Sequence, residues 1–332
     1  MKRRKKTFII LAVILVVVLL VAGYIKFFNG RLIYFTTGMK SGELIKTAGQ
    51  KTTYTCEADI LMSDVKKEYE EMFGSNIWRE KIGDADFESY IKDQIKSKLM
   101  RVKAMNVKAK ERGVVLGREE KDSVGKAVDA FYNELTESQI SSTGITKDKL
   151  NTMFTEFAIA QKLYDDLTSS MDIEVSADEA RVIDIQYIVS DSEEDINKAY
   201  NLVNSGSSFF AVAKEYNADG EYEYELKRGE MDAAFEKAAF NLSTGEMSSI
   251  VEATGRYYII RCTSDNDKAK TEVNKSAILE KRKLEQFNAD FEKYESGIYM
   301  EFNNSEWKKI SIQDAYMLGS SFEDTFNAYF GK

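Results

Sequence analysis

The sequence predicts a fold of the α+β class, in which a compact sheet-containing domain is inserted between segments of an all-α region and preceded by one transmembrane helix. Three observations predict it: an apolar run near the N-terminus, apolar residues at helical spacing on both sides of the middle, and strand-like segments between them. The 332 residues are enough for two domains with sizeable cores. Because 43% of them are apolar and 30% charged, we expect a mostly globular chain.

The first 25 residues have the features of a membrane anchor. Five lysines and arginines at positions 2–6 precede an apolar run over residues 8–25, which would rise about 27 Å as a helix. The positive flank places the N-terminus in the cytoplasm and the bulk of the chain outside the cell membrane. A cleaved signal peptide is the competing interpretation, but its apolar stretch is normally shorter and ends at a small-residue site, which we do not find at residues 21–24.

Charge and composition exclude several kinds of partner and chemistry. The total charge of −9, less the five positive charges of residues 1–25, leaves −14 on the remainder, which argues against binding nucleic acid. The chain has no histidine, so a Ser-His-Asp or Cys-His arrangement is excluded and a zinc site is not expected. We find no nucleotide-binding glycine motif and expect no cofactor. Cys56 and Cys262 are too isolated to suggest a metal site, and we expect two unpaired thiols, a disulfide between them being the alternative.

Helical periodicity dominates residues 26–173. A linker with one short strand or helix is expected over residues 26–59. Helices are predicted over residues 84–112, with Gly113 as the stop, over residues 118–135, and from a cap at Thr146.

The pattern changes over residues 174–265, which we predict to be a separate domain. Strands are predicted at residues 181–189, 249–252 and 256–263, and helices at residues 192–204, 208–216 and 232–241. This order builds an antiparallel sheet covered by helices. Helical period returns in residues 266–332, whose long helix and tail we expect to pack back on the N-terminal helices.

One stretch of the central domain is similar to a known family. Residues 228–231 (R-G-E-M), 235–240 (F-E-K-A-A-F), 245–248 (G-E-M-S) and 257–261 (Y-Y-I-I-R) follow the order and spacing of the second half of a parvulin domain. The layout as a whole resembles the PrsA/SurA type of extracytoplasmic foldase, in which a parvulin-type peptidyl-prolyl isomerase module interrupts a helical chaperone domain. The resemblance implies a parvulin-like sheet at residues 174–265 and chaperone-like helical flanks.

The same resemblance implies a set of site residues. Met231 and Phe235 match the apolar floor for the proline ring, and Asp219 falls where the family has a catalytic aspartate or cysteine. Gln186 and Tyr258 stand where the family has its two histidines, so we expect isomerase activity to be weak or lost. The family's strand that walls the pocket is not recognisable in residues 221–226. The alternative to a binding site is that Met231 and Phe235 are ordinary core residues of an amphipathic helix. For Asp219, the alternative to a catalytic role is a solvated aspartate in a turn.

These observations favour a membrane-anchored foldase that binds unfolded or proline-containing segments of exported proteins. The alternative is a non-catalytic chaperone or protein-interaction module on a degenerate parvulin fold. A structural envelope protein without clients is a third possibility, which draws little support from the sequence. Other enzyme classes have no recognisable motif here.

The absence of proline has a direct consequence for refolding. Prolyl isomerisation delays refolding by tens of seconds, and this chain has no X–Pro bond to isomerise. In a double-jump experiment we expect the refolding amplitudes to be independent of the time spent unfolded, and an added prolyl isomerase to accelerate no phase. A slow phase that grows with the unfolding delay would contradict this expectation.

Overall fold

The computed structural model describes residues 38–218 and 220–331. These residues form two compact units, the first joining the chain up to Ser170 to the chain from Ala289 onward, and the second spanning Met171–Asn288. The anchor predicted at residues 1–25 lies outside the described residues. Within the described ranges, no helix combines the length and the apolar character needed to cross a membrane.

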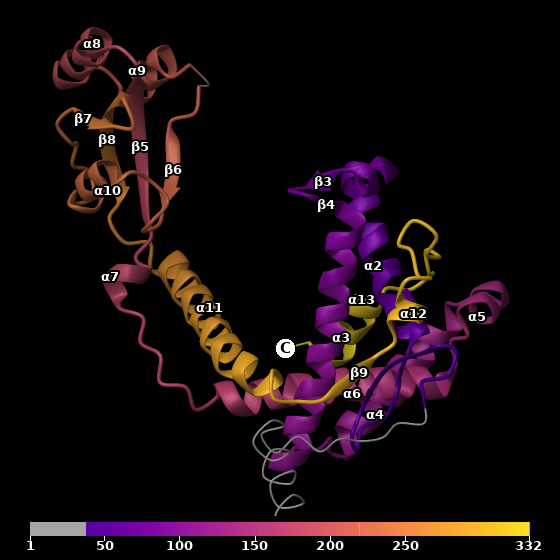
Figure 1. Cartoon of the computed structure of the whole chain (residues 1–332). Coiled ribbons are helices and arrows are strands. Elements are labelled where there is room, and N and C mark those ends of the chain that lie inside the picture. Colours follow the sequence, from indigo (N-terminus) through magenta and orange to yellow (C-terminus); the bar gives the residue numbers. More distant parts are fainter. Residues whose placement is uncertain (1–37, 219, 332) are drawn as a thin grey trace, which may run out of the picture. The chain divides into compact units, whose positions relative to one another are not determined.

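The first unit is built mainly from helices, and the predicted ones are found (Figure 1). The helices of this unit are α2 (Thr55–Phe73), the 3-10 turn η1 (Ser75–Arg79), α3 (Phe87–Arg112), α4 (Arg118–Asn133), α5 (Glu137–Thr143) and α6 (Lys147–Thr168). Of these, α3, α4 and α6 are the predicted helices, whereas the sequence does not predict α2, η1 or α5. Asp86 caps α3 by accepting a hydrogen bond from the Ser89 amide at 2.8 Å. Gly113 ends the helix with φ +74°, a left-handed conformation that suits glycine. Thr146 caps α6 as expected.

The first unit also contains strands, so the prediction of an all-α region is wrong in this respect. Strand β1 (Glu43–Thr47) pairs antiparallel with β2 (Thr53–Tyr54) and with β9 (Met300–Phe302). A hairpin joins β3 (Lys81–Ile82) to β4 (Ala85–Asp86). These strands are too short to show periodicity, and β1 and β9 are distant in the sequence, so no local pattern identifies their pairing.

The C-terminal segment completes the core of the first unit. It contains α12 (Asn304–Trp307) and α13 (Phe322–Phe330). The ring of Phe322 lies 4.6 Å from that of Phe154 in α6, centroid to centroid. The Asp64 carboxylate accepts hydrogen bonds from the Phe322 and Glu323 amides and so caps α13. The two ends of the described chain therefore share one apolar core.

A buried ionic cluster lies inside the first unit. The Lys103 ammonium donates to the Glu156 carboxylate at 2.6 Å and to the Lys51 carbonyl at 2.7 Å. Glu57 is buried beside this pair and accepts a hydrogen bond from the Tyr54 amide at 2.9 Å. Burial raises the pKa of Glu57 to about 8, and the charge of Glu156 adds to the rise while that of Lys103 opposes it. The cluster therefore holds a proton at neutral pH.

The second unit is a four-stranded antiparallel sheet with helices on both faces (Figure 1). The strand order is β6-β5-β8-β7, with β5 at Ile183–Ser190, β6 at Glu223–Leu226, β7 at Val251–Ala253 and β8 at Arg256–Ser264. The helices are α7 (Ala177–Ala180), α8 (Glu193–Asn204), α9 (Phe209–Tyr216) and α10 (Ala233–Phe240).

Alternation along the two central strands divides the interior of this unit into two cores. Ile185, Val189 and Ile260 face α10 and pack in one cluster with Phe235 of that helix. The intervening residues Ile188 and Ile259 face α8 and α9, where they meet, for example, Phe209 and Val212. The candidate functional site lies on the face of the sheet that carries α10.

Helix α11 (Lys268–Glu295) begins in the second unit. The Thr271 hydroxyl accepts a hydrogen bond from the Val182 amide at 3.0 Å, and the Lys270 ammonium lies 2.6 Å from the Asp184 carboxylate of β5. The second unit consequently extends to Asn288, beyond the boundary expected at residue 265. Among the apolar residues that recur at helical spacing along α11, Val273 and Leu284 are exposed, whereas Phe287 and Phe291 are buried.

The raised pKa of Glu57 makes the stability of the first unit depend on pH. The folded protein holds this proton up to about pH 8, whereas the unfolded chain releases it near the ordinary glutamate pKa of 4.5. The free energy of unfolding therefore falls as the pH rises from about 4.5 to about 8. We expect Glu57→Gln, which keeps the acceptor for the Tyr54 amide, to stabilise the unit at pH 9 by on the order of 2 kcal/mol and to change little at pH 5.

Thermal melts of the full chain across this pH range measure the effect. The exposed Glu71, changed to Gln, serves as the control and should leave the melting temperature unchanged at both pH values. Equal stabilisation by Glu57→Gln at pH 5 and pH 9 would show that Glu57 does not carry the proton.

Candidate functional site

A hollow of about 220 Å³ opens on the α10 face of the second unit. Its walls come from β5, β6, the start of α10 and the β7–β8 hairpin, through the side chains of Tyr187, Val189, Tyr224, Met231, Phe235, Arg256 and Tyr258. The Phe235 and Tyr258 rings meet edge to face, with centroids 5.1 Å apart. The lining is therefore mainly aromatic and apolar, with polar groups at the rim.

The segment before α10 holds Met231 in place. The Glu236 carboxylate accepts hydrogen bonds from the Gly229 amide at 2.7 Å and from the Met231 amide at 3.1 Å. Gly229 has φ +86°, which a side chain at this position would strain. The Arg228 guanidinium binds both carboxylate oxygens of Asp178 and lies 3.9 Å above the ring centroid of Phe240. The R-G-E-M-x-x-x-F-E pattern thus builds a rigid support, and Met231 and Phe235 are its members that reach the hollow.

Asn217 fixes the opposite wall. Its buried side-chain amide donates to the Tyr187 carbonyl at 3.0 Å and accepts from the Val189 amide at 2.9 Å. It also donates to the Glu221 carbonyl, at the entrance to β6. A buried amide with these partners fastens the loop after α9 to β5. The two lining residues of β5 are consequently held in one position.

The polar groups of the hollow do not form an acid–base pair. Its described lining residues include no aspartate, glutamate, cysteine or histidine. Burial raises the pKa of Tyr224, and the neighbouring charge of Glu230 adds to the rise. The hydrogen bond to Asp191 raises the pKa of Arg256. Tyr224 and Arg256 therefore keep their charge states at neutral pH, and the hollow can enclose an apolar group and donate hydrogen bonds to a polar group attached to it.

The structure brings together three of the five site residues expected from the sequence. Met231, Phe235 and Tyr258 line the same hollow. Gln186 lies on the other face of β5, where its amide donates to the Glu223 carboxylate at 3.1 Å. Strand alternation explains this, because Gln186 is out of phase with the hollow-facing Tyr187. Asp219 lies outside the described residues.

Sequence reasoning missed both lining residues of β5, Val189 and Tyr187. Ile185 and Val189 lie two residues before and after Tyr187, and both face α10. The alternation of side chains along the strand therefore indicates that the Tyr187 side chain points to the same face. Arg256 and Tyr224 were also missed. Arg256 reaches the hollow from a tight hairpin, and Tyr224 from β6, so only the folded chain places them there.

Strand β6 forms where the sequence showed no recognisable strand. It pairs with β5 through four residue pairs, from Ile183 opposite Leu226 to Gln186 opposite Glu223. It lies at the edge of the sheet, and Leu226 is its only buried residue. An edge strand of this kind carries little apolar pattern. The wall of the hollow that was in doubt is therefore present.

The two cysteines lie in separate units and are unpaired and buried. Burial raises the pKa of the Cys56 thiol to about 12, so this group stays protonated. Across residues 38–218 and 220–331, no group of three metal-binding side chains is found.

Comparison with known families identifies the central part of the chain. Residues 189–264 match the rotamase family described as the PPIC-type PPIase domain. A foldase protein PrsA of Caldanaerobacter subterraneus is 25% identical over 240 residues, which cover 67% of this chain and 73% of the relative. A foldase protein PrsA of Bacillus subtilis is 38% identical over 89 residues, or 24% of this chain and 30% of the relative.

Two solved structures align with most of this chain. The crystal structure of a peptidylprolyl isomerase (PrsA) from Bacillus cereus covers 87% of this chain and 99% of its own, with 18% identity and a TM-score of 0.37. The structure of a foldase protein (PrsA) from Lactococcus lactis covers 80% of this chain and 96% of its own, with 15% identity and a TM-score of 0.37.

Phe235 is part of the core as well as of the hollow, since only 1% of its surface is exposed. We expect Phe235→Ala to lower the free energy of unfolding of the second unit by about 3–5 kcal/mol, because it leaves a cavity between α10 and the sheet. Hydrogen exchange of the β8 amides during denaturant titration measures this change. The half-exposed Phe210, changed to Ala, should cost less than about 1 kcal/mol. Equal costs for the two variants would contradict the core role of Phe235.

Proposed function

We propose that this chain, which carries a PPIC-type peptidyl-prolyl isomerase domain and is similar to PrsA foldases, is a membrane-anchored extracytoplasmic foldase. It binds unfolded, proline-containing segments of exported proteins, and its isomerase activity is weak or lost. The observation that carries the proposal is the hollow: Met231, Phe235 and Tyr258 preserve an apolar site of about 220 Å³. The basic N-terminal residues and the apolar run behind them support the anchor and the extracytoplasmic location.

The chemistry of prolyl isomerisation is compatible with such a site. The barrier of about 18–20 kcal/mol comes from amide resonance, and no bond to the protein needs to form. An apolar surround that disfavours the planar, solvated amide lowers this barrier, and hydrogen-bond donors that favour the twisted amide lower it further. The hollow supplies the apolar surround through Met231 and Phe235. Its polar contribution is limited to tyrosine hydroxyls and the Arg256 guanidinium, which is already bound to Asp191.

Tyr187 takes the place that the resemblance gives to the first histidine. A residue in that role has to reach the proline site, and Tyr187 does so while Gln186 faces away. Val189 pairs with Tyr258 across β5 and β8, so Tyr187 and Tyr258 lie on the same face of adjacent strands. Two phenols thus stand where the family has two imidazoles. A phenol donates a hydrogen bond but is a poor base at neutral pH, which supports reduced rather than full activity.

A non-catalytic chaperone remains the second candidate, favoured by the same replacement of both histidines. In that case the hollow is a docking site for an apolar or proline-containing segment, and no rate enhancement accompanies binding.

The isomerase activity is tested with the full-length chain in mild detergent and a chromogenic X–Pro tetrapeptide. We expect the chain to accelerate isomerisation by less than about tenfold over the uncatalysed rate, because the hollow lacks the pair of histidines that the resemblance implies. Restoring imidazoles at the hollow-facing positions, with Tyr187→His and Tyr258→His together, should raise the rate by about tenfold or more.

The matched control places the first imidazole one residue away. Gln186→His with Tyr258→His should give no more activity than Tyr258→His alone, since residue 186 faces the other side of the sheet. An unmodified chain that is as active as a histidine-containing PPIC-type enzyme would refute the proposal of weak activity. A larger gain from Gln186→His than from Tyr187→His would refute the assignment of Tyr187.

The foldase function is tested separately by light scattering from a chemically denatured client protein. We expect the full-length chain to suppress aggregation at roughly stoichiometric ratios, because both a hollow and an anchored helical unit are available for binding. Undiminished aggregation at a severalfold excess of the chain would contradict both the foldase and the chaperone proposals.

A further inference from the structure

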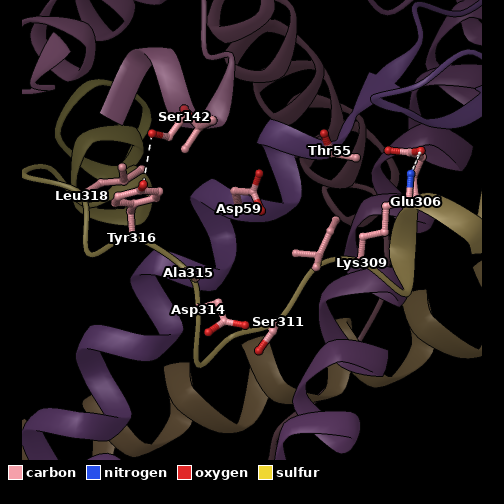
Figure 2. Close-up of a pocket in the computed structure, with 12 residues that line it drawn as sticks. Thr55, Asp59, Ser142, Glu306, Lys309, Ser311, Asp314, Ala315, Tyr316 and Leu318 are labelled. Carbon is pink, nitrogen blue, oxygen red and sulfur yellow. Dashed lines mark hydrogen bonds and ion pairs between the residues drawn. The ribbon is translucent and has the colours of Figure 1, made fainter. Parts of the chain in front are cut away.

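A second cavity, of about 260 Å³, lies within the first unit and is not part of the isomerase domain (Figure 2). Its floor is the first turn of α2, with Thr55 and Asp59, and its walls are the end of α5 and the chain from Glu306 to Leu318. Figure 2 shows the Asp59 carboxylate in the middle of this cavity, with the polar side chains around it. The cavity is therefore centred on a carboxylate.

The segment that covers the cavity is tied down on both sides. The Glu88 carboxylate accepts hydrogen bonds from the Ser311 hydroxyl and the Ile312 amide, at 2.8 and 2.7 Å. The Lys66 ammonium donates to the Gln313 and Ala315 carbonyls, at 2.6 and 3.0 Å. These bonds use side chains of α3 and α2, both of which belong to the core of the unit. The cavity is consequently preformed rather than left by a loose loop.

The two edges of the cavity are closed by internal contacts. The Tyr316 hydroxyl donates to the Ser142 hydroxyl at 3.0 Å. At the other edge, the Lys309 ammonium lies 2.6 Å from the Glu306 carboxylate, which also accepts from the Gly42 amide. Both contacts are drawn in Figure 2. The only cation of the lining is therefore already paired with another carboxylate.

Asp59 has neither a hydrogen bond nor an ion pair within the described part of the chain, although it is half-buried. Burial alone raises the pKa of Asp59 to about 6, so the group is ionised at neutral pH without a compensating partner. Asp314, on the covering segment, is a second lining carboxylate without a partner in the described residues. An unpaired carboxylate in a partly desolvated site costs stability unless a cation reaches it.

We propose that this cavity binds the side-chain ammonium or guanidinium group of a basic residue in an extended polypeptide. Three carboxylates and one ammonium line it, so its formal charge is complementary to a cation. The hydroxyls of Thr55 and Ser311 supply further acceptors, and Ile310, Ala315 and Leu318 offer apolar surface for the aliphatic stem of the side chain. Only the choice of a client polypeptide as the source of the cation rests on the foldase function.

The direct test follows the amide resonances of Ser142, Ser311 and Tyr316 in the full-length chain by NMR. The probe is a capped heptapeptide with one central lysine in a glycine-serine background, and the reference peptide has norleucine at that position. We expect saturable shifts with the lysine peptide only. Asp59→Asn should weaken binding by about tenfold, whereas Asp93→Asn, which removes an exposed aspartate of α3 outside the cavity, should change it less than about twofold.

Two further readouts separate binding from a structural role. Binding should weaken as the pH falls below about 6, where Asp59 takes up a proton, and a saturating lysine peptide should lower the pKa of Asp59 itself. Asp59→Asn should also raise the melting temperature at pH 7.5, so the loss of binding cannot be attributed to unfolding.

The proposal is overturned if no lysine-dependent shift occurs up to about 10 mM peptide, or if Asp59→Asn and Asp93→Asn bind the peptide equally well. Saturable binding in a chain that fails to suppress client aggregation would leave the cation site standing and refute the foldase function alone.

Discussion

The antiparallel pairing of β5 with β8 is the constraint on which the functional unit depends. Its register places Val189 opposite Tyr258 and Tyr187 opposite Ile260, and alternation then sends one set of side chains toward α10 and the other toward α8 and α9. A shift of one residue would exchange the two cores and remove Tyr187 and Tyr258 from the hollow. On its other edge, β5 is bonded to the Asn217 side chain through the backbone of Tyr187 and Val189.

The hollow that results has the shape of a binding site without acid–base groups. Its apolar floor is shared with the core, because Phe235 packs on the sheet while Met231 lies at the opening, half-buried. The floor is therefore retained by the demands of folding as well as by those of binding. Tyr258 has the same double role, since it is buried in this core and also lines the hollow.

The first unit shows how distant parts of a chain form one body. β1 pairs with β9, and Phe154 packs on Phe322, so neither end of the described chain completes the core alone. Hydrogen bonds to the Glu88 carboxylate and from the Lys66 ammonium fasten the connecting segment, and the Asp59 cavity lies beneath it. Its polar lining contrasts with the mainly apolar hollow of the second unit.

Local periodicity and a motif of fixed spacing are enough to predict the capped helices α3 and α6, the central strands and the similarity of the central domain to the rotamase family. The motif also identified Met231, Phe235 and Tyr258, whose positions follow from it. Three features emerge only from the folded chain: Tyr187 rather than Gln186 faces the hollow, β6 closes its wall, and β1 and β9 form a sheet in a unit expected to be all-α. The sequence also shows no sign of the buried cluster of Lys103, Glu156 and Glu57 or of the cavity around Asp59. The physical reason is that strand phase, edge pairing and burial of charge are set by contacts between distant segments, which no local pattern records.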